Sequence, residues 1–219
     1  MIPSADAAFV CAMENVLEVY ARPYDAKNPV VNMDESPKQL VSELRESYIG
    51  ADGIKYTDNE YKREGAAELV MITEPLVGRR EVRVEQDHSG VTFAIIIAYI
   101  VEQMYADADL ITLVMDNLSS HKVHNLYKVF EPARARAIMK RLEIVYTPKH
   151  GSWLNIAECE LSVLSRQALK KRFATKEELE KQVHAWAAKR NNLQKGVDWQ
   201  FTTADARIKL KKLYPTLLT

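Results

Sequence analysis

The sequence has few cysteines, few glycines and no long apolar run. Its two cysteines, Cys11 and Cys159, lie far apart and form no C-x-x-C pair, which excludes a disulfide framework and a thiolate zinc site. Seven glycines and eight prolines in 219 residues exclude collagen-like and low-complexity chains. No apolar stretch approaches the roughly 20 residues of a membrane span, and the first residues lack the basic start of a signal peptide. We therefore expect a cytoplasmic protein with no membrane partner.

The chain also lacks net charge, but its two halves differ. Residues 1–115 contain 10 basic and 20 acidic side chains, whereas residues 116–219 contain 20 basic and 10 acidic ones. The second half can therefore bind a polyanion although the whole chain is neutral. Solvated helix faces give the same pattern, and charge alone favours that interpretation. A neutral total also argues against a simple high-affinity DNA clamp.

Apolar periodicity predicts one globular unit of alternating strands and helices. The expected strands are 29–33, 67–73, 80–86, 110–115 and 142–146. The expected helices are 5–21, 90–105, 122–141 with a break at Pro132, 153–173, 176–191 and 204–214. Residues 37–64 are polar without clear periodicity, and we expect a long, partly irregular excursion there. This order predicts an α/β fold, with a mixed five-stranded sheet and helices on both faces.

Two of the predicted strands end in an aspartate. Asp34 follows the strand at 29–33, and Asp116 follows the apolar run Leu110–Met115. Ligands of open α/β sheets gather at the carboxyl ends of the strands. Two carboxylates placed there repel each other unless a cation lies between them, and oxygen ligands favour Mg²⁺ or Mn²⁺. For either aspartate alone, a turn or a helix cap remains the better interpretation.

A third acid could come from the helix predicted after Gly151. On a helical wheel, Trp153 and Leu154 join an apolar stripe, so that Trp153 is expected in the core. Glu158 and Glu160 fall on opposite flanks of this stripe, and periodicity cannot choose between them.

The five histidines form no recognisable zinc motif. His121 and His124 are three residues apart, but no third ligand can be placed beside them. Surface or hydrogen-bonding roles are expected, and His121 and His150 stand out because each lies near an acid or a strand end. Common nucleotide-binding, serine-hydrolase and zincin motifs do not occur.

Three segments, VVNMDE, LVMDNLSSHK and LEIVYTPKHGSWLNIAECELSVLSRQ, occur in this order. Together they resemble the catalytic domain of insertion-sequence transposases of the mariner-related DDE superfamily, from about Phe9 to Tyr214. The resemblance implies an RNase H-like fold and two Mg²⁺ ions, with Mn²⁺ as a substitute. By motif position, the ligands and catalytic acids are Asp34, Asp116 and Glu158, so the resemblance selects Glu158 over Glu160.

The implied activity is cleavage of DNA at the element ends and strand transfer into a target, expected at TA dinucleotides and within a homodimer. The residues expected to contact DNA are Lys149, His150, Trp153, Arg166, Lys170, Lys171 and Arg172. For each of these cations, a solvated helix end is an equally good interpretation. Two alternatives stay open: a truncated, non-catalytic DNA-binding or inhibitory remnant, and another RNase H-like nuclease that cuts without joining.

The predicted organisation has three parts. Residues 1–28 form an N-terminal helix and linker, residues 29–192 an RNase H-like DDE catalytic domain, and residues 193–219 a basic tail with a short helix. Two features depart from the family pattern. The 41 residues between Asp116 and Glu158 exceed the usual spacing, and we assign the extra length to residues 131–141. About 28 residues before the first strand are too few for a helix-turn-helix module, which predicts a catalytic fragment, a split reading frame or a truncated copy.

Overall fold

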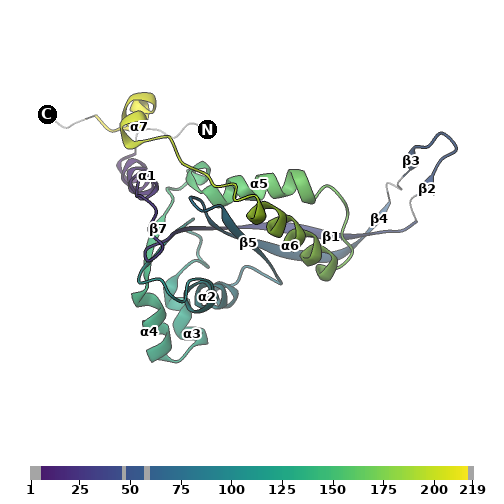
Figure 1. Cartoon of the computed structure of the whole chain (residues 1–219), viewed down its shortest axis with the longest axis horizontal. Helices are drawn as coiled ribbons and strands as arrows, with labels where there is room; N and C mark the ends of the chain where they lie inside the picture. Colours follow the sequence, from purple (N-terminus) through teal and green to yellow (C-terminus); the bar gives the residue numbers. More distant parts are fainter. Residues whose placement is uncertain (1–5, 46–47, 57–59, 217–219) are drawn as a thin grey trace.

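The centre of the fold is a mixed five-stranded sheet (Figure 1). The computed structural model describes residues 6–45, 48–56 and 60–216. The strand order is β5-β4-β1-β6-β7, with β4 antiparallel to β1 and β5, and β6 parallel to β1 and β7. The bounds are β1 Val30–Glu43, β4 Tyr61–Glu74, β5 Arg79–Glu85, β6 Ile111–Met115 and β7 Leu142–Tyr146. The predicted mixed five-stranded sheet is confirmed.

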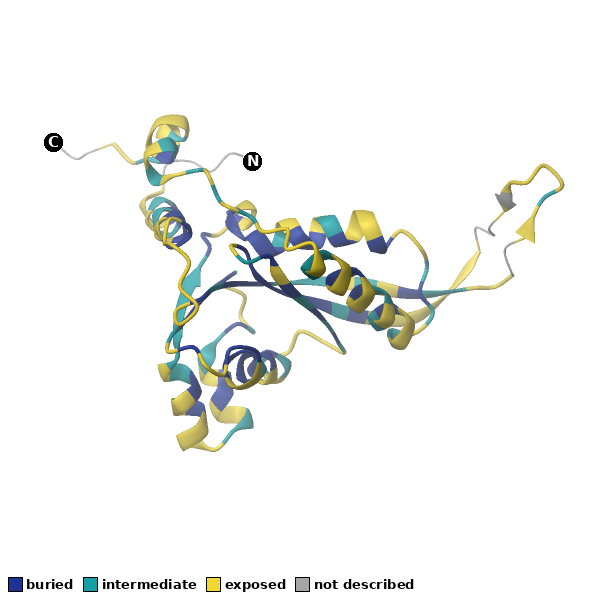
Figure 2. Ribbon diagram, in the orientation of Figure 1, coloured by how far each residue is buried: buried dark blue, intermediate teal, exposed yellow. Residues whose placement is uncertain are grey.

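Helices cover both faces of the sheet, as predicted (Figure 1). Side chains of β4 alternate between the faces: Leu69 and Met71 pack with α5 and α6, and Val70 and Ile72 pack with α2. The buried residues therefore lie in layers above and below the sheet (Figure 2). The helices are α2 Gly90–Tyr99, continued by a π-helical turn Ile100–Met104; a 3₁₀ turn Val123–Asn125; α3 Leu126–Val129; α4 Pro132–Lys140; α5 Ile156–Ala168; and α6 Lys176–Asn192.

Residues 37–64 form an excursion as predicted, but the described part is mainly a regular β-hairpin and not irregular. Residues 46–47 and 57–59 lie outside the described residues. β1 and β4 continue pairing out to Glu43 and Tyr61, and the hairpin projects from the body (Figure 1). Most side chains in the projecting part of the hairpin are exposed, so no alternation of apolar and polar residues marks its strands. The register shifts after Leu40, opposite Gly65, whose φ of 117° suits a bulge. The outer part carries β2 Tyr48–Ile49 and β3 Lys55–Tyr56.

The first and last helices pack together beside the sheet. α1 Ala7–Tyr20 begins at the N-cap Asp6, and the tail forms α7 Thr203–Lys209 and a 3₁₀ turn Lys211–Leu213. Both contribute side chains to one apolar cluster with Val114 of β6. The predicted helices at both ends are confirmed, whereas the division into three parts stays a prediction. Within the described ranges, no helix is long and apolar enough to cross a membrane.

Candidate active site

The register of the sheet places Asp34 and Asp116 just beyond the point where the pairing of β1 with β6 ends. β1 and β6 pair in parallel only as far as Asn32 and Val114. Asp34 and Asp116 each come two residues later, Asp34 inside β1 and Asp116 directly after the last residue of β6. The predicted end of the first strand at Met33 is therefore wrong, because β1 continues to Glu43, whereas the predicted end at Met115 is confirmed. Past this point β1 pairs with β4, and β6 pairs with β7. The aspartates therefore lie where two central strands separate, the usual location of a ligand site in an α/β sheet.

Asn155 brings the start of α5 to the same part of β1. It is the N-cap of the helix: its Oδ1 accepts a hydrogen bond from the Ala157 amide (3.1 Å), and its Nδ2 donates to the Met33 carbonyl of β1 (2.9 Å). Glu158 lies in the first helical turn and is thereby held beside Asp34. The helix is shorter than the predicted 153–173 at both ends: residues Ser152–Leu154 form a separate 3₁₀ turn, and α5 ends at Ala168.

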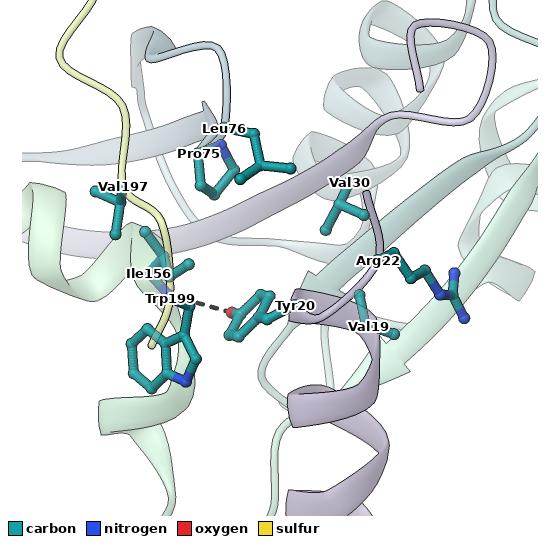
Figure 3. A pocket seen from close by; sticks show the side chains of 9 residues that line it. All are labelled: Val19, Tyr20, Arg22, Val30, Pro75, Leu76, Ile156, Val197 and Trp199. Carbon is teal, nitrogen blue, oxygen red and sulfur yellow. Dashed lines mark hydrogen bonds between the residues drawn. The ribbon is translucent and has the colours of Figure 1, made fainter. Parts of the chain in front are cut away.

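Tyr20, the last residue of α1, also holds the start of α5 in place. Its buried hydroxyl donates to the Leu154 carbonyl (2.7 Å) and accepts from the Ile156 amide (3.4 Å) and from Asn32. Burial raises the pKa of the Tyr20 phenol, so the group stays neutral. Figure 3 shows Tyr20 directed toward Ile156 in a mainly apolar pocket that Trp199 also lines. The hydrogen bonds of Tyr20 thus hold the start of the acid-bearing helix in place.

Asp34 has a strongly raised pKa. Burial raises its pKa to about 7, and the negative charges of Asp116 and Glu158 add to the rise. The Oε2 atom of Glu158 is buried without a hydrogen-bond partner. Within the described part of the chain, no three His, Cys, Asp or Glu side chains are grouped closely enough to hold a metal ion. Asp34 therefore senses the charges of Asp116 and Glu158, but the three side chains do not converge on one point.

Glu160 has a different environment from Glu158, two residues earlier on α5. It is buried, and its carboxylate lies 3.2 Å from Nε of Arg80 and 3.0 Å from Nη2 of Arg190. These arginines belong to β5 and α6, so Glu160 joins three elements of the fold. The helical wheel left the two glutamates equivalent, and these tertiary contacts distinguish them.

His121, which the sequence singled out because it lies near an acid, forms a hydrogen bond to that acid, and Glu35, which the sequence did not single out, lies on its other side. The fully buried imidazole donates from Nδ1 to Oδ1 of Asp116 (2.6 Å). Its Nε2 lies 3.3 Å from Oε1 of Glu35, an ion-pair distance without hydrogen-bond alignment. Burial opposes protonation, but the two carboxylates outweigh it and raise the pKa of His121 to about 9. The only sequence signals are the acid directly after Asp34 and the histidine five residues after Asp116.

Three of the residues predicted to contact DNA lie near the acids. Lys149 and His150 are exposed and line an open groove together with Asp116. Trp153, three residues further on, is 42% exposed, so the expectation that it lies in the core is wrong. The reason is that α5 begins after Trp153, and the wheel therefore does not apply to it. Its indole instead stacks on Trp199, with 6.5 Å between ring centroids.

The other four predicted DNA contacts lie at the far end of α5. Arg166 is in the last turn of the helix, and Lys170, Lys171 and Arg172 follow it. The rise of a helix places them about 12 Å or more from Glu158. Lys171 and Arg172 lie over the rings of Phe173 (5.0 Å) and Tyr61 (5.5 Å), respectively. The structure therefore separates the seven residues into two groups.

Residues 29–180 match the family described as DDE superfamily endonuclease. The chain belongs to this family. Its fold resembles that of Mos1 in the strand transfer complex (TM-score 0.59, 14% identity, 86% of this chain and 55% of that one). It also resembles Mos1 in the paired-end complex with the left transposon end (TM-score 0.57, 15% identity, 96% and 63%). A third match is the Mos1 mariner paired end complex with Mn (TM-score 0.54, 16% identity, 89% and 60%).

These matches confirm the RNase H-like fold and the resemblance to mariner-related DDE proteins. The chain spans 55–63% of the length of these three Mos1 chains. No curated protein matches the sequence.

Proposed function

We propose that this DDE family chain is the catalytic domain of a transposase of an insertion sequence. It would cleave DNA strands at element ends and join them to target DNA by phosphoryl transfer. The observation that supports the proposal is the pKa of Asp34, which burial and the charges of Asp116 and Glu158 raise to about 7. Burying a carboxylate next to two others is unfavourable in the absence of a cation, and a metal ion would remove this cost.

The side chains of Asp34, Asp116 and Glu158 suit Mg²⁺, with Mn²⁺ as a substitute. Carboxylate oxygens are the ligands that both ions prefer, and the buried Glu158 Oε2 lacks a partner that an ion would supply. Because the three acids are not yet grouped around a single point, binding would require their side chains to rotate inward. When bound, the ions would activate the attacking oxygen and stabilise the leaving oxygen in an in-line displacement at phosphorus. Two of the Mos1 structures are described as complexes with Mn and with Mg.

The neighbouring residues would hold DNA in the groove beside Asp116. Lys149 and His150 line this groove, and their side chains would contact phosphates. Trp153 would pack against the sugars or bases at the groove edge. We propose that Arg166, Lys170, Lys171 and Arg172 contact the duplex further from the scissile bond. We also propose a homodimer that joins element ends and a TA target, as the mariner resemblance implies.

A cleavage and strand-transfer assay tests this proposal. A labelled duplex that carries a candidate element end is incubated with the chain, Mg²⁺ and a supercoiled target. We expect nicked and joined products with the wild type, and neither product with Asp34→Asn, Asp116→Asn or Glu158→Gln. Glu177→Gln, an exposed acid on α6, is the matched control and should keep activity.

The products also separate the alternatives. Nicking without joining would indicate a nuclease rather than a transposase. DNA binding without any product, with either metal, would indicate a non-catalytic remnant. Full activity in excess EDTA would contradict the metal-dependent mechanism.

A further inference from the structure

The backbone ladder between β1 and β6 ends before either aspartate is reached. The last paired residues are Asn32 and Val114, and no β1–β6 backbone pair lies beyond them in the described strands. Asp34 and Asp116 therefore sit on diverging strands, where hydrogen bonds between the two backbones no longer set their separation. A site that uses both carboxylates needs some other group to fix that distance.

His121 and Glu35 form a side-chain connection at this position. Glu35 follows Asp34 on β1 and points to the opposite face of the sheet, with a side chain that is only 7% exposed. The imidazole lies between Oε1 of Glu35 (3.3 Å) and Oδ1 of Asp116 (2.6 Å). Since a carboxylate can only accept, each imidazole nitrogen faces an acceptor. The connection runs from one acid-bearing strand to the other.

The imidazole itself is held rigidly. It is fully buried and stacks on Phe93 of α2, with 5.0 Å between ring centroids. The backbone carbonyl of His121 accepts a hydrogen bond from the hydroxyl of Tyr146 on β7 (3.0 Å). Such a ring can move little, so its hydrogen bond fixes one oxygen of Asp116 and leaves the other free.

We propose that His121, supported by Glu35, is a positioning residue that sets the distance between Asp116 and Asp34 and so prepares the pair to bind a divalent cation. The proposal rests on the proposed function, because it assigns the two aspartates as ligands. His121 would not touch the ion or the DNA. It would act by orienting Asp116, in the way that hydrogen-bonded groups around a metal site orient its ligands.

Mn²⁺ binding in the absence of DNA tests the proposal without any catalytic readout. The dissociation constant is measured by electron paramagnetic resonance for the wild type, His121→Phe, His121→Asn and Glu35→Gln. An asparagine amide can take the place of Nδ1 and donate to Asp116, whereas phenylalanine cannot. We expect Mn²⁺ affinity to fall 10-fold to 100-fold in His121→Phe and to stay within about threefold of the wild type in His121→Asn. The Mn²⁺ affinity of Glu35→Gln should lie between the affinities of the two His121 variants.

Tyr105→Phe is the control for a merely structural role. It removes a buried hydrogen bond to Glu74 (3.1 Å) and touches neither His121 nor the two aspartates, so it should lower the melting temperature without changing Mn²⁺ affinity. If His121→Phe does not fold, His121→Asn and Glu35→Gln still decide the matter: a loss in His121→Asn as large as in Glu35→Gln would overturn the proposal. Equal Mn²⁺ affinity in all folded variants would overturn it and leave the proposed function standing. No Mn²⁺ binding by the wild type would overturn both.

Discussion

Glu160 and Arg80 form an ion pair in the interior, 3.2 Å apart, with side chains that are only 3% and 1% exposed. The pair links α5 to β5, and Arg190 of α6 adds a second positive charge 3.0 Å from the same carboxylate. The carboxylate of Glu160 is therefore occupied by two guanidinium groups. This leaves Glu158 as the acid of α5 that can serve a ligand.

We expect Glu160→Gln to destabilise the protein without removing its chemistry. The substitution leaves Arg80 and Arg190 without a counter-charge, and breaking such a buried pair costs about 3 kcal/mol or more. Urea unfolding should show the loss, and cleavage assayed well below the melting temperature should persist. Glu158→Gln is the matched comparison: it should abolish cleavage and leave the free energy of unfolding unchanged or higher. Equal stability of Glu160→Gln and the wild type would contradict the structural role of Glu160.

Asp34→Asn should stabilise the metal-free protein in a pH-dependent way. The pKa of Asp34 is about 7 in the folded state, against roughly 3.9 in an unfolded chain. The folded protein thus binds the extra proton between these values, and ionisation of Asp34 destabilises it as the pH rises. The advantage of asparagine should be absent below about pH 4, grow up to pH 7 and stay constant above it, at a magnitude on the order of 1 kcal/mol or more.

Urea unfolding in EDTA at pH 4 and pH 8 measures this difference. Asp109→Asn, which changes an exposed acid, should show no such pH dependence. A constant difference between Asp34→Asn and the wild type across this range would show that Asp34 is not perturbed by its neighbours.

Asn155 should matter to both stability and activity, because it caps α5 and holds it to β1. Asn155→Ala removes the acceptor of the Ala157 amide and the donor to the Met33 carbonyl. We expect a loss of about 2 kcal/mol in the free energy of unfolding, together with reduced cleavage. Asn155→Ser restores the cap alone and should recover about half of the stability. A serine variant as inactive as the alanine one would show that activity depends on the bond to Met33 and not on the cap.

The sequence was sufficient to predict the five strands of the sheet, although β1 and β4 run further than predicted. Fully buried strands such as Ile111–Met115 are continuous apolar runs, and the acid that ends such a run is visible in the sequence. The outer hairpin could not be predicted, because few of its side chains are buried and its backbone hydrogen bonds leave no pattern in the sequence. Periodicity in the sequence reflects which side chains are buried, and few side chains of this hairpin are buried.

The rest of the site depends on contacts between distant parts of the chain. Arg80 and Arg190 distinguish Glu160 from Glu158, yet they lie 80 and 30 residues away from it. The contact of His121 with Glu35 likewise requires two strands to be brought together. Trp153 was misplaced because a helical wheel assumes a helix, and the helix begins after it. These contacts are properties of the tertiary fold and leave no local signature.

Divalent ions should stabilise the wild type and lose this effect in the acid variants. An ion that binds only the folded state raises stability by about 2.7 kcal/mol at a concentration of 100 times its dissociation constant. Mg²⁺ and Mn²⁺ should therefore raise the melting temperature of the wild type, but not that of Asp116→Asn. Ca²⁺ should raise it as well and fail to support cleavage, because its looser geometry misplaces the reacting oxygens. Equal stabilisation of wild type and Asp116→Asn by Mn²⁺ would indicate that the ion binds elsewhere.

DNA binding by this chain should depend on salt and little on sequence. The groove beside Asp116 is lined by Lys149 and His150, whose proposed contacts are with phosphates and would read no bases. Fluorescence anisotropy with element-end and scrambled duplexes should give similar affinities that fall steeply between about 50 and 200 mM salt.

Lys149→Gln should weaken binding to both duplexes equally and reduce the slope of log affinity against log salt by about one. Lys189→Gln, on the exposed face of α6 and outside the groove, is the matched control and should change the slope less. A preference of roughly a thousandfold for the element end would show that this chain contains a surface that reads bases. Loss of that preference in Lys149→Gln would then place the surface at the groove itself.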